Sequence, residues 1–101
     1  MKSIMQKKSD GECYLCRLLH DDYDRRENLE EHHVFGGANR HLSEKYGLKV
    51  YLCAEHHRTS KEAVHQNSAI SLELKQRAQK AFMDKYPYQD FISVFGKNYL
   101  Y

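Results

Sequence analysis

The clearest apolar pattern of the chain lies in its last third. Six apolar residues recur there at helical spacing, and they are Ile70, Leu74, Ala78, Ala81, Phe82 and Tyr86. This spacing places them on one face of a helix. We expect an amphipathic helix that takes Asn67 or Ser68 as its N-cap, ends before Pro87 and covers a small core.

The aromatic tail after this helix predicts a second, shorter helix. Phe91 and Phe95 are four residues apart, which is about one helical turn. We expect this segment to pack back on the longer helix. Residues 67–101 would then be a helical extension with a structural role.

The middle of the chain carries strand signals. Residues 48–52, Leu-Lys-Val-Tyr-Leu, alternate between apolar and polar at first and contain Val and Tyr, which favour strands. A second short strand is expected near residues 29–35, where Gly36 and Gly37 end it.

Short helical segments are expected around these strands. Residues 43–46 would form one helical turn that Gly47 stops, because glycine suits the position after a helix. A helix should begin near Ala54 and run toward Lys61. Residues 1–11 carry no periodic pattern and are expected to be a flexible arm. The whole pattern predicts an α+β fold.

Composition and charge bound the class of protein. The chain has 101 residues, of which 41% are apolar, so we expect one domain over residues 1–101 in which a bound metal would add stability. No apolar run is long enough to span a membrane, and the first residues lack the apolar core of a signal peptide. We therefore expect a cytoplasmic protein without membrane contact.

Charge is unevenly distributed along the chain, although its net value is only +2. Acidic residues crowd positions 10–31, whereas positions 32–61 hold five basic residues and only two acidic ones. A local basic patch can bind phosphates on a nearly neutral protein, because salt screens charge beyond about 8 Å. An ordinary solvated surface of mixed charge is the alternative interpretation.

Three cysteines and one histidine form two pairs with metal-ligand spacing. Cys13 and Cys16 are separated by two residues, as are Cys53 and His56. Such pairs in tight turns can direct four side chains to one tetrahedral Zn²⁺. Thiols in a reducing compartment seldom form disulfides, so a structural zinc site is the favoured interpretation.

Two pairs of adjacent histidines suggest a second site. Neighbouring helical residues point about 100° apart, so His56 and His57 should serve different sites. His32 and His33 would face opposite sides of a strand, and both could reach one cavity only where the strand opens into a loop. The alternative for each pair is structural histidines bonded to backbone carbonyls.

These motifs together resemble a known family. Along the chain the motifs read Cys-x₂-Cys, then Glu-His-His-Val-Phe-Gly-Gly, then Leu-Cys-x₂-His-His-Arg-x₂-Lys. This series is similar to that of the HNH endonucleases of the ββα-metal class, in the zinc-clipped subgroup of phages and mobile elements. The similarity covers residues 12–66. It implies a small ββα-metal (HNH) motif with a structural zinc knuckle, in a bacterial or phage-infected cell.

The resemblance also implies roles for single residues. His32 and His57 would hold the catalytic metal, His33 would be the general base, and the structural zinc would bind Cys13, Cys16, Cys53 and His56. His65 follows His57 by two helical turns, so it could join the catalytic metal only if the helix breaks near residues 59–61. A surface histidine is the equal alternative for His65.

The implied activity is metal-dependent hydrolysis of phosphodiester bonds in DNA. The catalytic ion would be Mg²⁺, Mn²⁺, Ni²⁺, Co²⁺ or Zn²⁺, and imidazole ligands favour the last four over Mg²⁺. Four basic residues would bind backbone phosphates: Arg40, Lys49, Arg58 and Lys61. A protein partner would supply any sequence specificity, because no recognition helix is evident.

Two points leave alternatives open. The family's middle Asn corresponds to Leu48, and Asn39 is a possible substitute. The same zinc clip also suits a non-catalytic module that binds nucleic acid or protein and needs neither His33 nor His57. The nature of the nucleic acid and the oligomeric state stay open.

Overall fold

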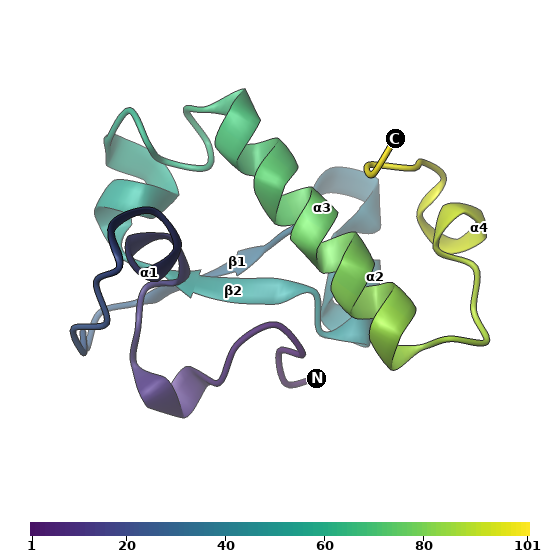
Figure 1. The fold of residues 1–101 in the computed structure, drawn as a ribbon, viewed down its shortest axis with the longest axis horizontal. Helices are drawn as coiled ribbons and strands as arrows, with labels where there is room; N and C mark the ends of the chain where they lie inside the picture. The colour runs from purple at the N-terminus through teal and green to yellow at the C-terminus, as the bar shows by residue number, and fades with distance from the viewer.

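The sheet at the centre of the molecule has two antiparallel strands. The computed structural model describes all residues 1–101, and Figure 1 shows strands β1 (Glu30–His33) and β2 (Lys49–Leu52) beneath the long helix α3. His32 pairs with Val50 and His33 with Lys49. The expected α+β class and both strands are confirmed.

The connection between the strands is a compact helical segment. The 3₁₀ turn η2 (Gly37–Asn39) leads into α2 (Arg40–Tyr46), which ends at Gly47 with a φ of 73°. Ser43 is fully buried, and its hydroxyl accepts from the Phe35 N–H and donates to the Phe35 carbonyl. This pair of bonds fixes the loop that follows β1.

The C-terminal third forms as its apolar pattern predicts. Helix α3 (Ser68–Lys85) starts at Asn67, whose side chain accepts from the N–H groups of Ala69 and Ile70. Helix α4 (Phe91–Phe95) packs back, so that Phe91 and Phe95 join Leu74, Ala78 and Phe82 in one apolar core with the sheet. Neither helix has the length and apolar composition that crossing a membrane requires.

The opposite half of the molecule carries the cysteines. Helix α1 (Tyr14–His20) follows the 3₁₀ turn η1 (Lys8–Asp10), and the π-helical turn η3 (Glu55–Thr59) follows β2. The helix expected from residue 54 therefore ends at Thr59 instead of extending past Lys61. Cys13, Cys16 and Cys53 are all buried at this end of the core.

Residues 1–11 differ from the flexible arm expected from the sequence. The Ser3 hydroxyl donates to the Lys49 carbonyl, and the Ile4 N–H donates to the Gly47 carbonyl. Gln6 is buried, and its side chain accepts from the Tyr51 N–H. The segment therefore lies along β2, on the other side of that strand from α3 in Figure 1.

Gly47 should be essential for this docking. A Cβ at Gly47 would lie 2.4 Å from the Lys2 carbonyl oxygen, and its φ is in the left-handed region. We expect Gly47→Ala to lower the free energy of unfolding by more than the about 1–2 kcal/mol that left-handed backbone costs a non-glycine residue. Urea denaturation measures this change.

Gly96→Ala is the matched control for this experiment. Gly96 has a φ of 82°, but nothing lies within 4 Å of its would-be Cβ. Gly96→Ala therefore reports backbone strain alone. Equal destabilisation by the two substitutions would show that the clash with the N-terminal segment contributes nothing.

Candidate metal centres

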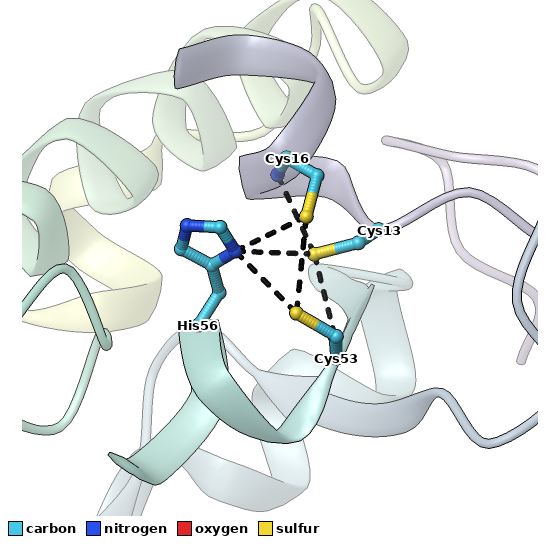
Figure 2. Close-up of side chains that lie close together, drawn as sticks. All are labelled: Cys13, Cys16, Cys53 and His56. Atoms are coloured by element: carbon cyan, nitrogen blue, oxygen red, sulfur yellow. Dashed lines mark hydrogen bonds between the residues drawn. The ribbon is translucent and has the colours of Figure 1, made fainter. Parts of the chain in front are cut away.

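The first candidate centre joins the two pairs with metal-ligand spacing, Cys13 with Cys16 and Cys53 with His56, which we call the zinc clip. Cys13 is the N-cap of α1, and its Sγ accepts from the backbone N–H of Cys16 at 3.5 Å and of Cys53 at 3.3 Å. Figure 2 shows Cys13 and Cys16 facing Cys53 and the Nδ1 atom of His56. All three cysteines are free thiols.

The distances in this Cys₃His cluster fit a tetrahedral ion. Sulfurs of Cys16 and Cys53 are 3.8 Å apart, and His56 Nδ1 lies 3.2, 3.4 and 3.8 Å from the sulfurs of Cys16, Cys53 and Cys13. A zinc ion with ordinary bond lengths needs about 3.8 Å between two sulfurs and about 3.5 Å between sulfur and nitrogen. The cluster is therefore compatible with a zinc site.

Burial gives the cluster a reason to bind a cation. The pKa of the Cys16 thiol is raised far above its usual range by burial and then by the neighbouring Cys13, and burial also raises the pKa of Cys53. Thiolates packed this closely are unfavourable on their own. A bound cation reverses that balance and deprotonates the thiols.

A carboxylate that the sequence analysis missed orients His56. Glu62 accepts from His56 Nε2 at 3.2 Å and from His20 Nε2 at 2.7 Å. The hydrogen bond from His20 lowers the pKa of Glu62 most, and the bond from His56 lowers it further. Because Nε2 carries the proton, Nδ1 of His56 is left to bind a metal. No sequence pattern marks Glu62 for this role.

The second candidate centre is a cluster of three histidines. His32 comes from β1, His57 from η3 and His65 from the loop before α3, and their candidate ligand atoms lie within 4.8 Å of one another. The Nε2 atoms of His57 and His65 are 3.2 Å apart. Two imidazole ligands of a tetrahedral ion are about 3.3 Å apart, so this spacing also fits a metal.

His65 reaches this cluster because the helix breaks after η3. Ser60 is extended, with φ −96° and ψ 169°, and the chain then turns so that the Val64 N–H donates to the His56 carbonyl at 2.8 Å. The return of the chain places His65 beside His57. The sequence left two interpretations of His65 open, a metal ligand and a surface histidine. The structure has the broken helix that the ligand role requires.

Glu30 orients His57 in the same way that Glu62 orients His56. His57 Nδ1 donates to Glu30 at 2.7 Å, which leaves Nε2 directed at the other two rings. That bond lowers the pKa of Glu30, as do the bonds from Arg58. Glu30 could have been found, since it is two residues before His32 and thus on the same strand face.

The surroundings of His32 and His65 favour their neutral, metal-binding form. Burial, followed by the nearby His57 and His65, lowers the pKa of His32 to about 3. Burial also lowers the pKa of His65. Neutral imidazole is the metal-binding form, so the lowered pKa values of His32 and His65 favour metal binding. Three protein ligands leave an open position for water or substrate.

His33 does not join this cluster, because the strand does not open into a loop at the histidine pair, which was the condition for a cavity shared with His32. Strand β1 continues through His33, so its side chain projects from the opposite face of the sheet. There His33 Nε2 lies 2.9 Å from a Glu44 oxygen and 3.4 Å from a Glu31 oxygen. The loop opens only after His33, too late to turn both rings to one side.

The four expected phosphate-binding residues divide into two groups. Arg40 and Lys61 are exposed. Arg58 is exposed but forms two bonds with Glu30. Lys49 is only 6% exposed, and its ammonium group lies between Glu31 and Glu44. Its expected role as a free phosphate-binding cation is therefore wrong, because two carboxylates already neutralise it.

The candidates for the middle Asn of the family have other partners here. Leu48 is a fully buried core residue. The side-chain amide of Asn39 donates to the Phe95 carbonyl at the end of α4. The loop after β1 is held instead by Ser43, through its two bonds to Phe35.

Comparison with known proteins gives no assignment. No family model, curated protein or solved structure matches this chain. A function for this chain therefore has to be inferred from the two clusters and from the fold that positions them.

Removal of one clip ligand should unfold the domain. We expect Cys53→Ala to lose zinc and its helical circular dichroism signal, because a structural zinc ion contributes about 10–16 kcal/mol, as much as the whole stability of a small domain. His65→Ala is the control and should keep both the spectrum and one tightly bound zinc. A folded Cys53→Ala variant would contradict a structural zinc site.

Proposed function

We propose that this chain is a metal-dependent endonuclease of the HNH type that hydrolyses phosphodiester bonds in DNA. The observation that carries this proposal is the division of two adjacent histidines between two clusters. His56 completes the Cys₃His cluster, whereas His57 meets His32 and His65. A module that needed only a structural zinc would have no use for the second cluster.

The order of the elements supports the same proposal. Two antiparallel strands are followed directly by the helical turn η3, and the three-histidine cluster lies between β1 and that turn. This is the strand–strand–helix order that the ββα-metal motif requires. We propose that β1, β2 and η3 are that motif, with the turn shortened to a single π-helical segment.

The three histidines would supply the chemistry through a divalent ion. Such an ion polarises a phosphoryl oxygen, stabilises the leaving oxygen and lowers the pKa of a bound water. The chain's own part is to hold the ligands, with Glu30 fixing His57 and burial keeping His32 neutral. An all-imidazole ligand set favours Mn²⁺, Co²⁺, Ni²⁺ or Zn²⁺ over Mg²⁺.

His33 enters the proposal as the general base. The hydrogen bond to Glu44 would hold its ring in one tautomer, as a carboxylate does for a catalytic histidine. His33 is the last residue of β1 and faces away from the three histidines, so this role requires its ring to move past the strand end when substrate binds. Catalytic hydrogen bonds often reach their final geometry only in the complex with substrate.

A non-catalytic zinc module is the second candidate function. The position of His33 on the opposite face from His32 favours it, because an enzyme needs its base near the metal. In that case the Cys₃His cluster would stabilise a domain that binds nucleic acid or protein without cutting. Cleavage assays on single-histidine variants separate the two candidates.

The His33→Ala variant is the sharpest test of the enzyme. We expect plasmid nicking in the presence of Mn²⁺, Co²⁺, Ni²⁺ or Zn²⁺ to slow by about 10²–10⁴-fold, which is the usual contribution of a general base. Zinc content and circular dichroism should not change. His41→Ala is the matched control, since His41 is exposed and lines the same surface hollow as His33.

The other outcomes of this assay are equally informative. Full activity in His33→Ala together with loss in His32→Ala would mean that metal-bound water reacts without a separate base. Absence of nicking by the unmodified chain with every metal would reject the endonuclease and leave the zinc module.

A further inference from the structure

A large surface hollow lies beside the N-terminal segment. Its volume is about 1180 Å³, and Lys49, Tyr51 and Glu31 line it from the sheet. Lys2, Lys7 and Lys8 line it from the N-terminal segment. The sheet residues in this hollow belong to the same face as His33, because they alternate with His32 and Val50.

The lysines of the N-terminal segment have no acidic partners. Lys2, Lys7 and Lys8 are exposed, and none of their ammonium groups lies within 4.0 Å of a carboxylate. Lys49 is different, because Glu31 and Glu44 neutralise it. The unpaired positive charge of the hollow therefore belongs to the N-terminal segment.

Hydrogen bonds of this segment anchor the backbone that carries its lysines. The side chain of Gln6 bonds both the Tyr51 N–H at 2.8 Å and the Glu12 carbonyl at 2.6 Å. The Ser3 hydroxyl bonds the Lys49 carbonyl at 2.5 Å. Three cations on an anchored backbone lose less conformational entropy on binding than three cations on a mobile tail.

A second hollow continues along the same face to the end of β1. Its volume is about 590 Å³, and it is lined by His33, Arg40 and Glu31 among others. Glu31 lines both hollows, so they adjoin. Arg40 adds an exposed cation beside His33.

We propose that these adjoining hollows bind the phosphate backbone of a nucleic-acid strand, with Lys2, Lys7 and Lys8 as the main contacts. Cations spread over an extended surface suit a polyanion with regularly spaced phosphates. A compact anion fits less well, because the exposed cations are spread over two hollows and do not converge on one point. The inference rests on the proposed function, since a strand on this face passes His33 at the end of β1.

The test removes three positive charges from the hollow and compares the effect on DNA binding with that of removing three positive charges elsewhere. One variant carries Lys2→Ala, Lys7→Ala and Lys8→Ala, and the control carries Lys80→Ala, Lys85→Ala and Lys97→Ala, which are exposed lysines of α3 and the C-terminal tail. Both are made in the His32→Ala background to prevent cutting. Fluorescence anisotropy measures binding of labelled single- and double-stranded DNA as salt is varied.

We expect the N-terminal variant to bind DNA about tenfold more weakly near 0.1 M salt. The slope of log K against log salt should fall in magnitude by about two to three, which is close to one for each lost phosphate contact. The control should bind like its parent. Equal weakening of both variants, an unchanged N-terminal variant, or no DNA binding by the parent would overturn the inference. Circular dichroism and zinc content verify that both variants are folded.

The inference and the proposed function can fail separately. Loss of binding only in the N-terminal variant, from a chain that never nicks DNA, would support the surface and reject the endonuclease. Nicking by the unmodified chain, with DNA binding that ignores Lys2, Lys7 and Lys8, would support the endonuclease and reject this surface.

Discussion

The structure depends on four side chains that converge where one cation fits. Cys13 and Cys16 come from the start of α1, and Cys53 and His56 come from the end of β2 and from η3. These segments are about forty residues apart in sequence, and the domain is small enough that its apolar core gives only modest stability. Without an ion, burial keeps the Cys16 thiol protonated, so the sulfurs form only weak contacts with one another. With one, the same contact locks α1 against the sheet and fixes the backbone around residue 56.

Fixing that backbone has a direct effect on the second cluster. His57 is joined to His56 by one peptide bond, so an ion bound to His56 would also set the position from which His57 meets His32. Each of the two histidines has its own carboxylate, Glu62 or Glu30, on the nitrogen that faces away from the cluster. The two clusters thus share a scaffold but have separate partners, which would allow one to hold an ion permanently while the other exchanged its ion.

Much of the frame could be predicted from the sequence because it follows local rules. Helix α3 has helical spacing, Asn67 caps it, and Gly47 ends α2 with positive φ. The Cys and His spacing likewise identified the first cluster. The position of His65 could not be decided, since it depends on where η3 breaks. The side of His33 depends on whether β1 stops one residue earlier or later, a difference that no sequence rule resolves. The docking of residues 1–11 was missed because Ser3 and Gln6 are polar and bind distant backbone, which leaves no periodic pattern.

The placement of Ser3 and Gln6 decides which edge of the sheet is open to a strand from another chain. A sheet of two strands has an unpaired border on each side, and an open border of this kind readily recruits a strand from a neighbouring chain. Along β2 the carbonyl of Lys49 and the N–H of Tyr51 are already taken by these two side chains. The first residues of the chain therefore cover the free edge of β2 and block the addition of another strand there.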